Sequence, residues 1–115
     1  MNKFYHYIVA SNATIYDCLE LFEVNNVHTV LVVNKNKVVG SVTDGDVRKS
    51  IILSRSLNTP VTKIMNRSFL SAKSLKDCLS IHKNHPHIFL IPVISEEGEL
   101  IDAYNCVSAT FISKE

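Results

Sequence analysis

Residues 38–48 read Val38-Val39-Gly40-Ser41-Val42-Thr43-Asp44-Gly45-Asp46-Val47-Arg48, a β-branched run that leads directly into a helical pattern. The valines favour a half-buried strand, and Val47 and Ile51 then recur at helical spacing. Thr43 ends the strand, and Asp46 follows three residues later. The start of a helix offers N–H groups and partial positive charge to a phosphate, and an ionised aspartate can accept from ribose hydroxyls. The junction is therefore a candidate site for both groups.

The same residues also permit a purely structural interpretation. Thr43-x-x-Asp46 resembles a capping box, in which the two residues satisfy each other's backbone N–H groups at a helix start. Two other segments, Thr14–Asp17 and Ser74–Asp77, have the same form. Only the Thr43 copy follows a strand with a glycine, Gly40, where a backbone or a ligand can approach closely. The four-residue pattern alone leaves both interpretations open.

The same order of elements occurs twice along the chain. Residues 14–19 align with 74–79 at an offset of 60, residues 31–33 with 92–94 at 61, and residues 38–40 with 100–102 at 62. The pattern predicts strands over 7–9, 29–33, 38–42, 69–71, 88–94 and 100–104, helices after Thr14, Thr43 and Ser74, and a last helix marked by Val107 and Phe111. The fold class is therefore α/β (α+β), with tandem βαββα repeats over residues 1–56 and 57–115 joined near Ser54–Pro60.

Neither repeat is long enough to bury its own sheet, so we expect the two to pack together about a pseudo-twofold axis. Such an axis creates two related clefts. Each cleft should lie where a returning strand ends and its helix begins, which is where α/β sheets commonly bind ligands.

Composition excludes several classes of protein. The chain has 115 residues, 46% of them hydrophobic, which suits one globular domain. A net charge of +1 favours neither nucleic acid nor an acidic membrane. No apolar run approaches the roughly 18 residues of a transmembrane helix, and residues 1–7 lack a signal-peptide core. Three cysteines without close spacing argue against a disulfide framework, so the cytoplasm is the expected location.

Over residues 7–111 the chain resembles a tandem pair of CBS domains, or Bateman module. The resemblance is carried by residues 38–48, by Asn58–Asn66 at the join, and by Ile91–Ile94 with Gly98–Ile101 in the second repeat. The Thr-Asp-Gly-Asp-Val-Arg version is most similar to CBS pairs that precede sugar-phosphate nucleotidyltransferase domains. Modules of this family bind adenine nucleotides and regulate an attached or partner protein, and they are not themselves catalytic.

The resemblance implies a ligand site in the first repeat. Thr43 corresponds to the family's phosphate-side threonine and Asp46 to its ribose-binding aspartate. Contacts to the base are expected near Ala10 and Val30. The full set of expected ligand-binding residues is Thr43, Asp46, Gly40, Ser41, Arg48, Ala10 and Val30. Arg48 is either a phosphate clamp or part of a solvated helix face.

The second repeat departs from this pattern. At the offset of 62, Gly40 corresponds to Asp102, Thr43 to Asn105 and Asp46 to Ser108. The ribose carboxylate is missing there, and Asp102 would bring negative charge close to phosphates. We therefore expect at most one competent cleft, with AMP, ADP or ATP as its ligand.

Other residue clusters favour structural roles. His82, His85 and His87 have no acidic or cysteine neighbour in sequence, so a core or loop position is favoured over a metal site. Cys18 and Cys78 occupy equivalent, core-facing helix positions. No nucleophile–base pair or paired carboxylates emerge, so we expect no catalytic residue, no metal and no required cofactor.

Two functions remain open at this stage. The first is a regulatory module that binds an adenine nucleotide and modulates an attached or partner enzyme, with these residues forming part of a nucleotidyltransferase. The second is a ligand-free dimerisation module. Under either function we expect a homodimer. Its motive is the apolar surface of Ile51, Ile52 and Leu53, which exceeds what one helix face can bury, together with that of Phe111 and Ile112.

Overall fold

The computed structural model describes residues 4–115, which form two three-stranded sheets and the helices that cover them. The first repeat consists of β1 (Ile8–Ala10), α1 (Ile15–Asn25), β2 (Thr29–Asn34), β3 (Lys37–Thr43) and α2 (Asp44–Ile52). The second repeat region consists of a 3₁₀ turn (Val61–Lys63), α3 (Leu75–Asn84), β4 (Leu90–Ile94), β5 (Leu100–Asn105), β6 (Thr110–Phe111) and a second 3₁₀ turn (Ile112–Lys114).

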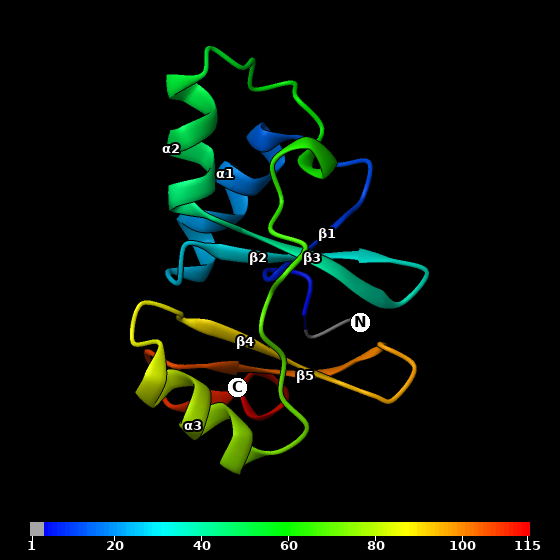
Figure 1. The fold of residues 1–115 in the computed structure, drawn as a ribbon, viewed down its shortest axis with the longest axis vertical. Coiled ribbons are helices and arrows are strands. Elements are labelled where there is room, and N and C mark those ends of the chain that lie inside the picture. Colours follow the sequence, from blue (N-terminus) through cyan, green and yellow to red (C-terminus); the bar gives the residue numbers. More distant parts are fainter. Residues whose placement is uncertain (1–3) are drawn as a thin grey trace.

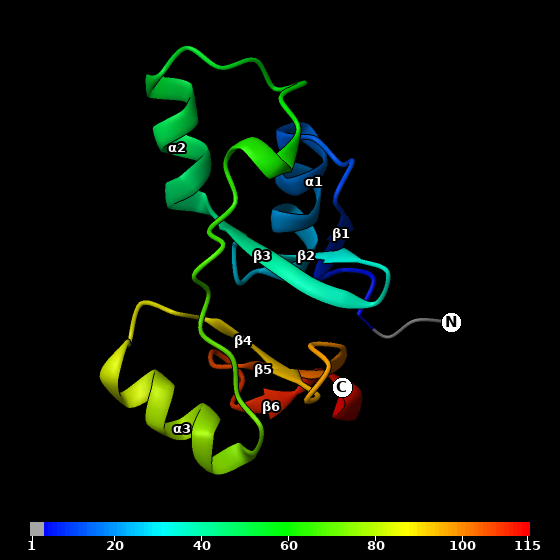
Figure 2. The same ribbon diagram turned by 45° about the vertical axis from the view of Figure 1, so that its right-hand side comes forward.

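The two sheets lie face to face, and the helices cover their outer faces (Figures 1 and 2). In the first sheet β1 is parallel to β2 and β3 antiparallel to it, and in the second sheet β5 pairs antiparallel with both β4 and β6. Both hairpins shift register at equivalent places, after Val32 and after Val93. The shared irregularity supports the predicted repeat, since β-bulges are specific features of a strand pair.

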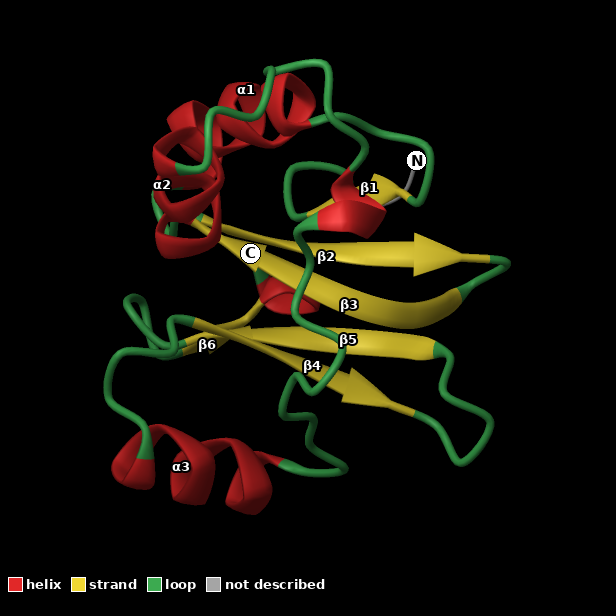
Figure 3. Ribbon diagram, turned by 45° about the horizontal axis from the view of Figure 1, so that its top comes forward, coloured by secondary structure: helices red, strands yellow, loops and turns green. Residues whose placement is uncertain are grey.

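Burial on both faces explains why β2 is apolar without alternation. Val30 and Val32 pack under α1 and α2, while Leu31 belongs to a cluster between the sheets. That cluster joins the repeats, because Tyr7 and Val27 pack in it with Leu90. The layered arrangement of helices, sheet, sheet and helix is visible in Figure 3. The two-repeat α/β fold is therefore as expected.

The predicted last helix is wrong. Residues 106–109 form turns, and Phe111 lies in the short strand β6, opposite Tyr104 of β5. The Asn105 side chain explains the turn, because its Oδ1 accepts from the N–H groups of Val107 and Ser108. Ala109 then has a positive φ of 56°, which ends any helical path. The second described repeat thus has a strand where the first has α2.

Two smaller expectations for the second repeat also need correction. Residues 69–71 are not a strand, and only Ala72 bridges to Val93 of β4. The helical spacing of Leu75, Cys78, Leu79 and His82 predicts one apolar face for α3, and that face is only partly buried. Cys78 is fully buried, but Leu75 and Leu79 are 47% and 52% exposed.

The connection after α2 packs back on the first repeat. Val61 and Met65 are buried in the core cluster under α1 and α2. The Met65 side chain fills the space next to Gly40, where an added Cβ would lie 2.7 Å from its sulfur. Asn66 then pairs with Ser41 at the free edge of β3. No helix within residues 4–115 is long and apolar enough to span a membrane.

Candidate functional site

A cleft of about 450 Å³ lies between the two repeats, at the end of β3. Such a volume is within the usual range of small-molecule sites. Its first-repeat wall consists of Thr29, Ser41, Thr43 and Asp46. Its second wall comes from the connection and the second repeat, through Asn66, Ser68, Phe69, Leu70, His85, His87, Ile88, Phe89, Leu90 and Pro92.

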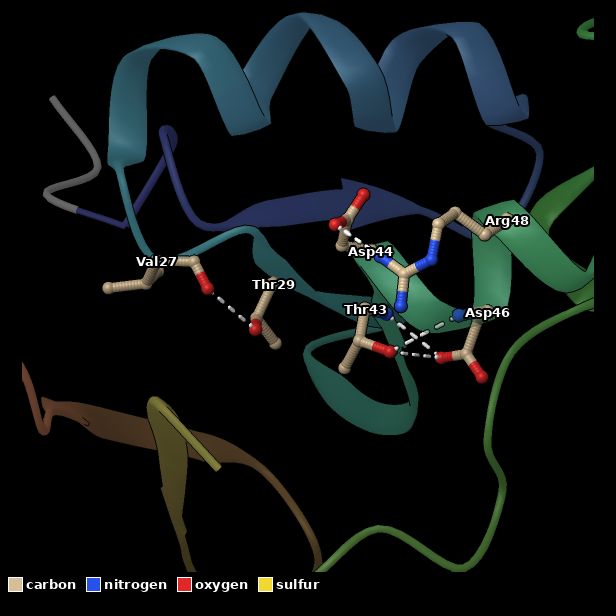
Figure 4. Close-up of polar contacts among 6 residues, drawn as sticks. All are labelled: Val27, Thr29, Thr43, Asp44, Asp46 and Arg48. Atoms are coloured by element: carbon tan, nitrogen blue, oxygen red, sulfur yellow. Dashed lines mark hydrogen bonds and ion pairs between the residues drawn. The ribbon is translucent and has the colours of Figure 1, made fainter. Parts of the chain in front are cut away.

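Thr43 and Asp46 form a complete capping box at the start of α2 (Figure 4). Asp46 Oδ2 accepts from the Thr43 N–H at 2.9 Å and from its hydroxyl at 3.0 Å. The Thr43 hydroxyl in turn accepts from the Asp46 N–H at 3.3 Å. Capping therefore accounts for one carboxylate oxygen, while Oδ1 has no hydrogen bond with residues 4–115 and can accept from a ligand.

The first turn of α2 has few donors left for a phosphate. The Asp44 N–H donates to the His28 carbonyl at 3.1 Å, and the Asp46 N–H is used in the capping box. Among the described residues this leaves the Gly45 N–H without a hydrogen-bond partner. To contact a phosphate, the Thr43 hydroxyl would have to turn its proton away from Asp46.

The same capping box occurs at α1, away from the cleft. Thr14 and Asp17 reproduce it with the same two distances, 2.9 and 3.3 Å. Neither residue lines the cleft between the repeats. The pattern and the two capping distances are thus the same at both helix starts. The α2 start differs in the additional contact from the Thr43 hydroxyl to Asp46 Oδ2 and in the packing of the second repeat against it.

The structure brings together three of the seven expected ligand-binding residues. Ser41, Thr43 and Asp46 line the cleft. Gly40 lies behind the wall against Met65, so its missing side chain serves packing. Arg48 forms an exposed ion pair with Asp44 at 2.6 Å and does not line the cleft. Val30 is fully buried under the helices, and Ala10 is exposed outside the cleft.

The apolar side chains of the cleft come from the second repeat, whereas we expected contacts to the base from the first. At the offset of 60, Ala10 corresponds to Leu70, and Thr29 at the start of β2 corresponds to Leu90 at 61. Leu70 and Leu90 both line the cleft. The sequence pointed to Ala10 and Val30 for contacts to the base, and neither lines the cleft. The pseudo-twofold axis was the available signal, because it brings the helix start of the first repeat against the segments around Leu70 and Leu90 of the second.

The corresponding position near the second repeat is filled by the chain itself. Ile112 is 2% exposed and packs in the same cluster as Val27 and Ala103, the counterparts of Ile88 and Ser41. Its neighbour Ser113 donates to Asp102 Oδ2 at 2.5 Å from its hydroxyl and to Oδ1 from its N–H. Asp102 therefore holds the C-terminal turn, and does not face an open phosphate site.

A contact between Tyr7 and Glu115 lies near the same turn. The Tyr7 hydroxyl donates to Glu115 Oε1 at 3.0 Å, which ties the start of the described chain to its last residue. Desolvation by burial, followed by that contact with Glu115, raises the pKa of Tyr7. The phenol thus stays a donor at neutral pH.

The thiols and histidines form no reactive or metal-binding set. Burial raises the pKa of Cys18 to about 12 and those of Cys78 and Cys106 to about 11, so all three stay protonated at neutral pH. Within residues 4–115, no group of three or more His, Cys, Asp or Glu side chains could hold a metal ion. The chemistry of the cleft is therefore that of hydrogen bonding, apolar contact and charge.

Comparisons with known proteins identify this architecture. Residues 3–53 match the CBS domain family, whereas no curated protein matches the sequence. A protein with CBS domains from Burkholderia ambifaria MC40-6 is 27% identical, with a TM-score of 0.72 over 90% of this chain and 78% of that one. The first repeat is thus similar to CBS domains in sequence as well as in fold.

Two further structures contain adenosine compounds. A CBS domain protein from Pyrobaculum aerophilum, solved with AMP, is 18% identical with a TM-score of 0.71, over 86% of this chain and 79% of that one. A CBS domain pair solved with 5′-methylthioadenosine and S-adenosyl-L-methionine is 20% identical with a TM-score of 0.71, over 94% and 85%. At these identities the likeness establishes a shared fold.

Proposed function

We propose that this CBS domain pair is a regulatory module that binds one adenosine-containing ligand in the cleft between its repeats. In this proposal Asp46 Oδ1 accepts from the ribose hydroxyls, and the base lies against the apolar wall. Thr43 and Ser41 contribute polar contacts beside the ribose.

The observation that carries the proposal is the composition of the cleft. One wall has a carboxylate with an unoccupied oxygen beside a threonine, and the facing wall has Phe69, Leu70 and Phe89. A nucleoside needs this pairing, because its base is flat and apolar while its ribose donates hydrogen bonds. AMP, 5′-methylthioadenosine and S-adenosyl-L-methionine share the adenosine moiety, and each was found with a protein of this fold.

The bound state is proposed to act on another protein or domain. Because the two walls come from different repeats, a ligand that contacts both changes the free energy of their arrangement, and so shifts a pre-existing equilibrium. The resemblance of the Thr43–Arg48 stretch favours a sugar-phosphate nucleotidyltransferase as the attached or partner enzyme. The cytoplasm is the proposed location, because the three cysteines show no disulfide spacing. The module itself is proposed to have no turnover.

The test is calorimetric titration of Asp46→Ala with adenosine and AMP, with Asp17→Ala as the matched control. Both variants lose an N-terminal capping acid in the same geometry, so each should lose on the order of 1 kcal/mol of stability. Only Asp46→Ala should weaken binding, by roughly tenfold or more, which is about 1.4 kcal/mol. Ser108→Ala, at the second-repeat counterpart, should bind as the wild type does.

Two results would redirect the proposal. Equal affinity in Asp46→Ala and wild type would remove Asp46 from the site. Failure of the wild type to bind any adenosine compound at millimolar concentration would favour the second candidate function, a ligand-free dimerisation module. The observation behind that candidate is the exposed apolar end of α2, where Ile52 is 81% exposed.

A further inference from the structure

Among the described residues, Thr29 is the buried polar side chain that lines the cleft, with 6% of its surface exposed. Its hydroxyl donates to the Val27 carbonyl at 3.0 Å (Figure 4). A hydroxyl has a single proton, so this bond leaves only lone pairs on Thr29 Oγ1. No group within residues 4–115 donates to those lone pairs. A polar ligand group that reaches Thr29 must therefore be a hydrogen-bond donor.

The buried Asn25 side chain fixes the turn that carries the Val27 carbonyl. Asn25 Oδ1 accepts from the N–H groups of Val27 and His28 at 3.0 and 3.2 Å. Its Nδ2 donates to the carbonyls of His6 and Thr29 at 2.9 and 3.0 Å. Because these bonds hold the turn between α1 and β2, the direction of the Thr29 proton is set by the fold. Thr29 Oγ1 is thus preorganised as an acceptor.

Thr29 lies on the same wall as the Asp46 carboxylate. It pairs directly opposite Thr43 in the β2–β3 hairpin, so the two side chains share one face of the sheet, with Cβ atoms about 5 Å apart. Thr43 Oγ1 is in turn 3.0 Å from Asp46 Oδ2. The wall therefore carries an acceptor at each end of this row. A nucleoside that has an amino group on its base carries donors at both ends, the ribose hydroxyls and the amino group.

Burial determines which part of a nucleoside meets Thr29. Thr29 and Leu90, which is 3% exposed, lie at the starts of β2 and β4, the two strands that contact each other across the sheets. Elsewhere in the cleft, Leu70 and Phe89 are 40% and 41% exposed. The flat base has the most apolar surface to remove from water, so it lies at the buried end. The ribose then lies at Asp46.

The 5′ end of such a ligand is directed at the exposed start of α2. The Gly45 N–H has no partner there among the described residues, and an added Cβ at Gly45 would lie 3.8 Å from a terminal nitrogen of the Arg48 guanidinium. The 5′ end therefore meets donors, whereas the base meets an acceptor.

We propose that Thr29 reads the base: its hydroxyl oxygen accepts from the 6-amino group of adenine, which makes the cleft specific for 6-aminopurine nucleosides. This inference rests on the proposed function and specifies the base at the same site. Thr29 is then a specificity-determining residue. Asn25 is a positioning residue, because it acts through the turn that receives the Thr29 proton.

The experiment compares adenosine with purine riboside, which lacks the 6-amino group and is otherwise the same. In calorimetry the wild type should bind adenosine roughly three- to tenfold more tightly, the size of one neutral hydrogen bond. Thr29→Val keeps the shape of the side chain and removes the acceptor, so the two compounds should bind it equally. Thr29→Ser keeps the hydroxyl and should keep the preference for adenosine.

Thr110→Val is the matched control. The Thr110 hydroxyl donates to the Ser108 carbonyl, two residues back, at the same distance of 3.0 Å, and Thr110 does not line the cleft. Its valine variant loses an equivalent bond and should keep the wild-type preference. Circular dichroism checks that each variant is folded, and Thr29→Ala serves as the acceptor-free variant if Thr29→Val is not.

The outcomes separate the two proposals. Equal binding of adenosine and purine riboside by the wild type would overturn the role of Thr29 and leave the adenosine site at Asp46 standing. A preference that persists without the Thr29 hydroxyl, or that is also lost in Thr110→Val, would do the same. Binding of neither compound would overturn the proposed function and this inference with it.

Discussion

At the scale of single residues, the same side-chain chemistry serves different purposes according to what packs against it. Thr14–Asp17 and Thr43–Asp46 are chemically identical capping boxes with matching distances. Only the second faces a wall from another repeat. The structure places the Asp46 carboxylate on the wall of a cleft, and the facing wall comes from residues such as Leu70 and Phe89, which are more than 20 positions away in the chain.

Gly40 offers a sharp test of packing at this scale. An added Cβ would lie 2.7 Å from Met65 Sδ and 2.8 Å from Cγ, so Gly40→Ala should destabilise the fold by about 1–3 kcal/mol through overpacking. Gly45→Ala is the matched control. Its Cβ would meet Thr43 Oγ1 at an ordinary 3.7 Å in a helix, so stability should stay level or rise by up to about 1 kcal/mol.

Urea unfolding of the two glycine variants measures the difference. The Met65→Ala background should remove most of the Gly40→Ala penalty, because the clashing atoms are gone. A penalty that is unchanged in that background would show that Gly40 is required for another reason, such as the backbone path beside the register shift in β3.

At the scale of elements, the chain was most predictable where caps and periodicity agreed. Thr14, Thr43 and Ser74 each begin a helix as expected, because each accepts from an N–H one turn ahead. The last helix failed because Val107 and Phe111 gave spacing without a cap, and the Asn105 side chain closed a turn first. Spacing alone does not choose between a helix and a strand that pairs Phe111 with Tyr104.

Ile112 of the C-terminal turn, which the sequence suggested as exposed dimer surface, is instead buried between the two sheets. Ile112 is 2% exposed in the cluster that joins the sheets, so Ile112→Ala should lose about 2–5 kcal/mol of unfolding free energy. Ile101, 58% exposed on β5, is the control, and its alanine variant should change stability by less than about 0.5 kcal/mol. Chemical denaturation of both variants measures the difference, and equal stabilities would show that the turn contributes nothing to the contact between the repeats.

At the scale of the whole molecule, the pseudo-twofold relates two positions between the repeats, and within residues 4–115 one is an open cleft and the other is filled. The first cleft opens between Asp46 and the start of β4, and the second position is filled by Ile112 and held by the Asp102–Ser113 contact. The repeat in the sequence predicts both positions. It does not predict whether each is open or filled by side chains, because that depends on how residues 110–115 pack against β5. One ligand per chain is the stoichiometry consistent with this asymmetry.

The exposed apolar end of α2 bears on how copies of the chain would assemble. The end of α2 exposes Ile51, Ile52 and Leu53 by 53%, 81% and 61%, a run of three large apolar side chains that no element of residues 4–115 covers. Contiguous apolar surface of this kind is a mark of an interaction site, and a second copy of the chain is the proposed partner. Ile52→Lys should therefore shift the protein from dimer to monomer in sedimentation velocity at tens of micromolar, because a dimer interface would have to bury the new charge.

Val107→Lys provides the control for that experiment. Val107 is 67% exposed in the turn after β5, far along the chain from α2, and its lysine variant should sediment as the wild type does. Because α2 begins at Thr43 and ends at this apolar run, one nine-residue helix would link the ligand cleft to the interface between copies. A dimer that persists in Ile52→Lys, or a wild type that sediments as a monomer, would remove that link and leave the ligand acting through the contact between the two repeats alone.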